Sequence, residues 1–281
     1  METTWSWTVT GYSHLHRSHE DIRRTCLHAG LSGVEGSAEL FAGLNDSELE
    51  ALADAYAADG LRFDSFHLPF AREDDIASFY ESTRRQAADK AGEWIERAGR
   101  LGVRAVIQHP TTCRDNVEAD GLEPFLTQLG KSLDSMLERA AGCDVTIAIE
   151  NMLPGDDGGR LGSRPEHFER FACAFDHPNL GFCLDTGHAL VAGRENAHAF
   201  PAAMGERLVA FHLADNAGDR DSHLAPGHGR VEWGHVFRAA HDLGHAGSMC
   251  IETPPFDFGP DYTDDAWKKL VDDTSALAQD I

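Results

Sequence analysis

Eight short apolar runs alternate with stretches of helical periodicity along this 281-residue chain. The runs have the composition of buried strands, and they lie near residues 6–10, 32–36, 62–68, 104–110, 144–151, 180–185, 208–215 and 248–254. Strict alternation of strands and helices is typical of βα units around a parallel sheet. Eight such units over this length predict a closed α/β (β/α)₈ TIM barrel, a single domain spanning residues 1–281 with its active site at the carboxyl ends of the strands.

The segments between the runs carry apolar residues at helical spacing. They cover residues 19–30, 45–60, 74–99, 121–142, 164–175, 196–204, 233–244 and 263–279, and residues 186–188 are expected to form a turn after the sixth strand. No GxGxxG motif follows the first strand, which disfavours a dinucleotide-binding sheet.

The composition of the chain indicates its cellular compartment and disfavours some classes of binding partner. No apolar run of 18 residues or more occurs, and the N-terminus lacks the pattern of a secretory signal, so neither a membrane segment nor secretion is expected. The six cysteines show no CxxC spacing, which favours reduced thiols in a cytoplasmic protein. The formal net charge of -23 repels a phosphate backbone, so a nucleic-acid partner is disfavoured.

Chemically active side chains stand at the ends of the third to eighth runs, and they are His67, His109, Glu150, Asp185, His212 and Glu252. Strand ends converge on one face of a barrel, where active sites lie. Any one of these residues could be an ordinary hydrogen-bonded loop residue. The whole set needs a cation, because buried carboxylates need a positive partner and few Lys or Arg lie nearby in the sequence. A divalent metal (Mn, Mg, Co or Zn) is therefore predicted, with no organic cofactor.

Two further segments add candidate ligands or substrate contacts. His188 follows Asp185 by three residues, and the Gly- and Pro-broken loop after the seventh run carries Asp221 and His223. These two are two residues apart, so both can face one ion in an extended segment. Phe70, in the loop after the third strand, is a candidate to stack on a sugar together with the tryptophans near the N-terminus.

The ordered motifs IEN, LDTGHA, HLAD, DxHLxPGxG and IETP resemble those of the xylose isomerase-like TIM barrel superfamily. That group includes sugar phosphate isomerases and epimerases, the D-tagatose 3-epimerase type and the endonuclease IV type. The resemblance extends from the GVEG of the second strand to IETP. Its epimerase branch implies one metal held by the two glutamates Glu150 and Glu252 together with Asp185 and His212, with both glutamates as acid and base. It also implies substrate contacts by His188 and by a cationic residue, for which Arg220 is the nearest candidate.

The endonuclease IV branch implies a site with three zinc ions. Its pattern uses the same four ligands plus second-metal candidates at His67, His109, His188, Asp221 and His223. All nine residue types occur here in the right order. The superfamily resemblance also implies a possible homo-oligomer.

Three functions follow from these residues. The first is a metal-dependent isomerase or epimerase of a small polyhydroxylated substrate (a sugar, sugar phosphate or keto-polyol), which moves a proton between two glutamates through a metal-stabilised enediolate. No strand ends in lysine, which disfavours a hydride shift. The second is a lyase or dehydratase acting on a keto-sugar, keto-inositol or glycoside, which shares the first step. The third is an endonuclease IV-like phosphodiesterase, and the acidic loops AREDD and GDRDS oppose it.

Overall fold

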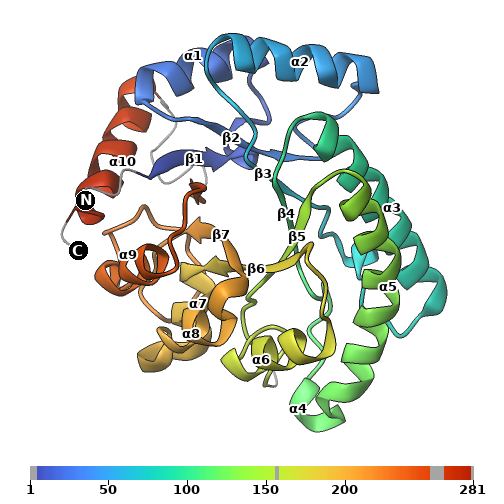
Figure 1. The fold of residues 1–281 in the computed structure, drawn as a ribbon. Helices are drawn as coiled ribbons and strands as arrows, with labels where there is room; N and C mark the ends of the chain where they lie inside the picture. The colour runs from blue at the N-terminus through green and yellow to red at the C-terminus, as the bar shows by residue number, and fades with distance from the viewer. Residues whose placement is uncertain (1–4, 156–157, 254–262, 280–281) are drawn as a thin grey trace.

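The computed structural model describes residues 5–155, 158–253 and 263–279. Its parallel strands close into one barrel in sequence order, with β1 paired to both β2 and β8 (Figure 1). The strands are β1 (Ser6–Thr10), β2 (Gly33–Ser37), β3 (Ser65–His67), β4 (Ala105–Gln108), β5 (Thr146–Glu150), β6 (Leu180–Asp185), β7 (Leu208–Leu213) and β8 (Ser248–Ile251). The predicted (β/α)₈ barrel is confirmed, and each of the eight predicted runs overlaps one of these strands.

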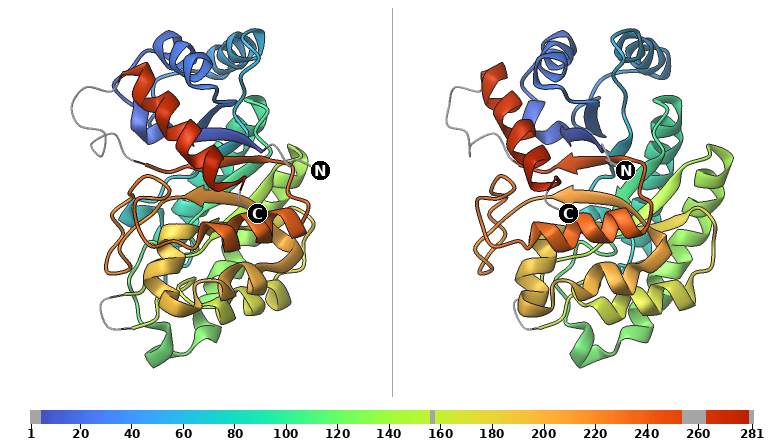
Figure 2. Two further views of the ribbon diagram at one scale, coloured as in Figure 1. Left: turned by 90° about the vertical axis from the view of Figure 1, so that its left-hand side faces the viewer. Right: turned by 60° about the vertical axis from the view of Figure 1, so that its left-hand side comes forward.

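Helices surround the barrel and cover the outer faces of the strands (Figures 1 and 2). They are α1 (His19–Ala29), α2 (Asp46–Ala58), α3 (Glu81–Arg100), α4 (Val117–Asp120), α5 (Leu122–Gly142), α6 (Pro165–Ala174), α7 (Thr186–Gly193), α8 (Ala199–Met204), α9 (Trp233–Asp242) and α10 (Asp264–Leu277). Within the described ranges, no helix is long and apolar enough to cross a membrane. Pro254, the last residue of the eighth predicted run, lies outside the described residues.

The helix predicted over 74–99 begins only at Glu81. Asp74 and Asp75 account for the difference, because their side chains accept hydrogen bonds from the backbone N–H groups of Ala71 and Ala77. Such local side-chain bonds offer the backbone an alternative to helix. The segment before Glu81 therefore forms turns over the end of β3 instead of a longer helix.

The turn predicted after the sixth strand is wrong, since α7 starts at Thr186 directly after β6. Asp185 is its N-cap, and the Asp185 carboxylate accepts a 2.6 Å hydrogen bond from the His188 backbone N–H. This cap fixes the position of His188 on the first turn of α7. It also holds the Asp185 carboxylate at the end of the barrel.

The strand register places the functional residues at one end of the barrel. In the parallel register, Glu150 of β5 pairs with Cys183 of β6, and Asp185 of β6 pairs with His212 of β7. The barrel interior below them is filled by a buried apolar cluster of Ile107, Ala148, Cys183 and Ala210. The loop that follows β7 projects beyond the strands at one end of the barrel (Figure 2).

Candidate metal centre

Four side chains from the consecutive strands β5 to β8 converge at the carboxyl end of the barrel. Glu150 ends β5, Asp185 ends β6, His212 lies near the end of β7, and Glu252 directly follows β8. Each offers one ligand atom, and these atoms all lie within 4.8 Å of one another. Glu150, Asp185 and His212 are buried, whereas Glu252 is partly exposed. The structure thus brings the four expected metal ligands into one cluster.

His212 lies between the two glutamates of this cluster. Its Nδ1 is 3.2 Å from Glu150 Oε1 and 3.3 Å from Glu252 Oε2. Its Nε2 lies 3.0 Å from Glu35 Oε2 on β2. Glu150 and Glu252, the two residues expected to move protons, therefore approach the same ring nitrogen from different strands.

The other oxygen of Glu150 meets two of the second-metal candidates. Glu150 Oε2 is 3.1 Å from His109 Nε2 and 3.5 Å from His67 Nε2. The Phe70 ring packs against both imidazoles, with centroids 4.8 Å from His67 and 5.0 Å from His109. The Glu150 carboxylate thus connects the His212 cluster to a second group of possible ligands.

The remaining second-metal candidates form a third group. His188 Nε2 is 3.3 Å from Asp221 Oδ2, and His223 Nε2 is 2.9 Å from the same oxygen. His188 Nδ1 lies 3.6 Å from Glu150 Oε1, which joins this group to the centre. The structure therefore places all nine residues of the predicted set around one site.

Three of these histidines are oriented by backbone carbonyl oxygens. Nδ1 lies 2.8–2.9 Å from a carbonyl oxygen in each ring, and the pairs are His67 with Leu68, His188 with Asn151, and His223 with Glu252. An Nδ1–H that donates to a carbonyl leaves the lone pair on Nε2, which is how histidine ligands are commonly held. Each Nε2 faces a carboxylate oxygen, so these rings are set to share a cation with it.

Two polar residues of the same motifs act on the backbone instead. The Asn151 side chain accepts a hydrogen bond from Asp185 N at 2.7 Å and donates one to Asp185 O at 2.9 Å. The Asp215 carboxylate accepts hydrogen bonds from the backbone N–H groups of Asn216, Gly227 and Val231. It also accepts one from the indole N–H of Trp233. Asn151 thus fixes a ligand strand, and Asp215 shapes the loop that presents Asp221 and His223.

Glu35 belongs to this cluster although no strand-end pattern predicts it. It lies within β2, is 1% exposed and accepts a 2.7 Å hydrogen bond from Ser65 Oγ in addition to its contact with His212. Its signal in the sequence is the carboxylate of GVEG inside an apolar strand, since a buried carboxylate requires a partner.

The charges of the cluster shift the pKa values of its members in opposite directions. Burial alone would lower the pKa of His212, but the surrounding acidic groups raise it well above its usual value. Burial alone would raise the pKa of Glu150, but His212 and His109 hold it well below the usual range. Burial raises the pKa of Asp185 well above its ordinary value, and the charges of Glu252 and Glu150 add to that rise. Without a cation, these shifts favour a protonated His212 beside an ionised Glu150, with Asp185 as a neutral acid.

The carboxylate oxygens of this site fit a divalent cation. Glu150 Oε2, Asp185 Oδ2, Glu252 Oε2 and Asp221 Oδ1 are buried and have no hydrogen-bond partner among the described residues. Histidine nitrogens lie near two of them, 3.1 Å from Glu150 Oε2 and 3.3 Å from Glu252 Oε2, and buried carboxylate oxygens of this kind favour a bound cation. Carboxylates combined with imidazole suit Mn²⁺, Mg²⁺, Co²⁺ or Zn²⁺.

Two predicted substrate contacts lie at the rim. Arg220 is exposed in the loop after β7 and makes no ion pair with the part of the chain that the structure describes. Phe70 is 40% exposed beside His67 and His109, where it can cover an apolar face of a ligand. The N-terminal tryptophans, expected to stack on a sugar as well, are instead buried, and Trp5 and Trp7 pack against Phe237.

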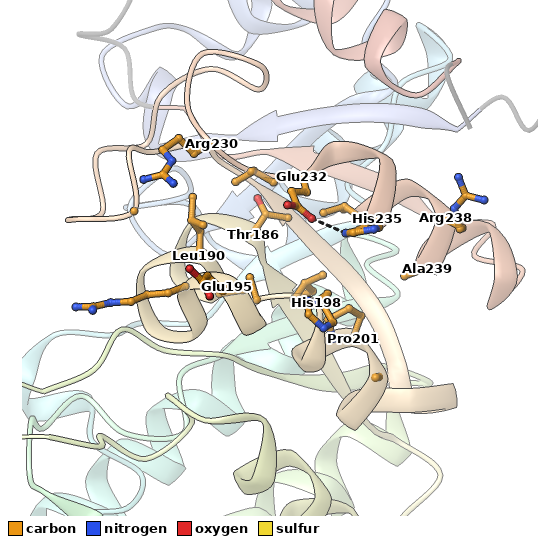
Figure 3. A pocket seen from close by; sticks show the side chains of 18 of the residues that line it. Thr186, Leu190, Glu195, His198, Pro201, Arg230, Glu232, His235, Arg238 and Ala239 are labelled. Atoms are coloured by element: carbon orange, nitrogen blue, oxygen red, sulfur yellow. Dashed lines mark ion pairs between the residues drawn. The ribbon is translucent and has the colours of Figure 1, made fainter.

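A cavity of about 980 Å³ lies outside the barrel, between α7, α8 and α9 (Figure 3). Leu190, Pro201 and Val236 contribute to its apolar lining, and the His235–Glu232 ion pair lies at its edge. None of the nine clustered residues is among the described residues that line it. This cavity is therefore separate from the candidate metal centre.

The chain is similar in sequence to other proteins. Residues 24–274 match the model of the family described as xylose isomerase-like TIM barrel. An uncharacterized protein, y4fM, of Sinorhizobium fredii is 25% identical over 275 residues, covering 90% of this chain and 86% of that protein. A probable endonuclease 4 of Oleidesulfovibrio alaskensis is 31% identical over 169 residues, about half (54%) of each chain.

The fold also matches solved structures over its full length. The crystal structure of a D-tagatose 3-epimerase-like protein superposes with a TM-score of 0.79 at 21% sequence identity, covering 98% of both chains. The family match spans most of the chain and includes every strand except β1. The chain therefore belongs to the xylose isomerase-like TIM barrel family.

Proposed function

We propose that this protein is a metal-dependent isomerase or epimerase of a small sugar or keto-polyol. The observation that carries the proposal is the placement of Glu150 and Glu252, whose oxygens lie 3.2 and 3.3 Å from His212 Nδ1 on different strands. Two carboxyl groups beside one cation site are what a proton transfer to and from a single carbon needs. The likeness to a D-tagatose 3-epimerase-like fold agrees with this reaction class.

Glu150, Asp185, His212 and Glu252 would hold the cation. These residues would hold a divalent ion against a carbonyl and the neighbouring hydroxyl of a sugar, and its charge would acidify the adjacent C–H. One glutamate takes the proton from that carbon, and the other carboxyl group returns a proton to it. His188 contacts a substrate oxygen, and Phe70 covers an apolar face of the substrate at the rim.

The first test is metal content together with turnover. Protein purified without added metal should carry about one Mn, Mg, Co or Zn per chain, measured by mass spectrometry. In D₂O, a converted keto-sugar should gain deuterium at the inverted carbon, because the proton exchanges with solvent on the glutamates. A hydride shift would leave that carbon free of deuterium. Protein that binds no divalent cation and converts no keto-sugar would contradict the proposal.

A second candidate is a phosphodiesterase with several metals, because two further ligand groups surround Glu150. His67 and His109 face Glu150 Oε2, and His188 and His223 face Asp221. The net charge of -23 opposes the binding of duplex DNA.

His109→Ala separates these two candidates. A single-metal epimerase should keep its metal content in this variant, whereas a centre with several metals should lose about one zinc per chain. The measurement is metal per chain for the wild type and the variant, with cleavage of abasic DNA as the activity assay. His241→Ala, an exposed histidine on α9, is the matched control. Two or three Zn per wild-type chain with DNA cleavage would favour the phosphodiesterase over the epimerase.

A further inference from the structure

The contact between Glu35 and His212 is the feature of the centre that the proposed reaction leaves unused. Glu35 Oε2 lies 3.0 Å from His212 Nε2, on the side of the ring opposite the ligand cluster. Both side chains are 1% exposed. Glu35 therefore touches neither Glu150 nor Glu252 but reaches them through the imidazole of His212.

The surroundings of Glu35 fix its carboxylate toward this ring. Ser65 Oγ donates a 2.7 Å hydrogen bond to the same oxygen, Oε2, that faces His212. The other oxygen, Oε1, is buried without a hydrogen-bond partner among the described residues. The hydrogen bond from Ser65 thus holds the carboxylate oxygen that faces His212.

The effect of Glu35 on His212 concerns which nitrogen of the ring carries the lone pair. A carboxylate that accepts from Nε2–H places the lone pair on Nδ1, and Nδ1 is the atom that faces Glu150 and Glu252. Without an acceptor at Nε2, the ring is free to keep its proton on Nδ1 and turn a donor toward the cluster. Histidine ligands with a carboxylate behind them also bind their metal more tightly.

We propose that Glu35 is a positioning residue that sets the cation affinity of the centre by orienting His212. The inference rests on the proposed function, because it assumes that His212 is a ligand. It assigns the buried carboxylate of β2 a role in metal binding rather than in folding alone.

The test is a titration of the metal-free protein with Co²⁺, in which calorimetry measures the binding affinity. Glu35→Ala should weaken Co²⁺ binding by about 10- to 100-fold, the range found when such outer partners are removed. Glu35→Gln keeps an acceptor oxygen but loses the charge. Its Co²⁺ affinity should therefore fall less than that of Glu35→Ala, but still by more than about threefold. Asp64→Asn is the matched control, because Asp64 is a buried carboxylate paired with Arg62 and Arg104 outside the centre.

The thermal unfolding of each metal-free variant separates a change of affinity from a change of fold. Co²⁺ binding within twofold of the wild type in Glu35→Ala would overturn the inference while leaving the proposed function intact. Should Glu35→Ala fail to fold, an unchanged affinity in Glu35→Gln would overturn it equally. A wild-type protein that binds no Co²⁺ would overturn the proposed function and this inference with it.

Discussion

Replacing Glu150 or Glu252 with glutamine is expected to abolish measurable turnover while the barrel stays folded. A positioned general acid or base contributes about 10²- to 10⁴-fold to a proton transfer, so each variant should lose at least that factor in kcat. Glutamine keeps the shape and the hydrogen-bonding capacity of the side chain but can neither accept nor return the proton. The loss should persist at saturating metal, since it concerns the proton and not the cation alone.

The two variants should differ in metal binding. Glu150 contacts His212 through one oxygen and His109 through the other, whereas Glu252 contacts His212 alone among these rings. Glu150→Gln should therefore weaken metal binding more than Glu252→Gln. Glu138→Gln, an exposed glutamate on α5, is the control with the same chemical change. Full kcat in either active-site variant, with circular dichroism unchanged, would remove that residue from the mechanism.

The fold was predictable because each buried parallel strand is visible in the sequence as a local apolar run. Each β strand of this barrel is a short apolar run between helical stretches, and the register of the barrel then follows from closure. The errors occur where side chains bind the backbone locally. Asp74 and Asp75 delay α3, and the Asp185 cap starts α7 where a turn is predicted.

The site was predictable to the extent that strand ends converge. Glu150, Asp185 and His212 are strand-end residues, and their meeting point follows from the topology. Glu35 was not predictable in this way, because it lies inside β2 and faces the back of His212. Its role depends on a contact across the barrel between residues 177 positions apart, which no local pattern contains.

The metal-free protein is expected to lose stability as the pH rises from about 6.5 toward 10. Neighbouring carboxylates raise the pKa of His223 from 6.5 to about 10 against the opposing effect of burial, and they raise the pKa of His188 and His212 in the same direction. A group whose pKa is raised on folding stabilises the fold below its unfolded pKa, and that contribution is lost as the pH rises through the folded value. Because each kcal/mol moves the Tm of a domain of this size by about 2–4 °C, the fall should be measurable.

The acid side has the opposite sign. Burial alone would raise the pKa of Glu252, but His212 lowers it from 4.5 to about 2, so its contribution is present above pH 4.5 and lost as the pH falls toward 2. His109 acts in the same sense, because burial lowers its pKa from 6.5 to about 4, so its contribution is lost as the pH falls through that range.

A divalent cation bound to these rings would take the place of the histidine protons. It would therefore remove the loss of stability at alkaline pH, and it would bind more tightly as the pH rises. The measurement is Tm in EDTA and in Mn²⁺ at pH 6, 7.5 and 9. The gap between the two curves should widen toward pH 9. His223→Asn should flatten the EDTA curve, and His235→Asn, an exposed histidine paired with Glu232, should not. A metal-free Tm that holds or rises from pH 6 to 9 would mean that these imidazoles are not held protonated by the carboxylates. The basis for expecting protons and metal to compete for the same ring nitrogens would then be lost.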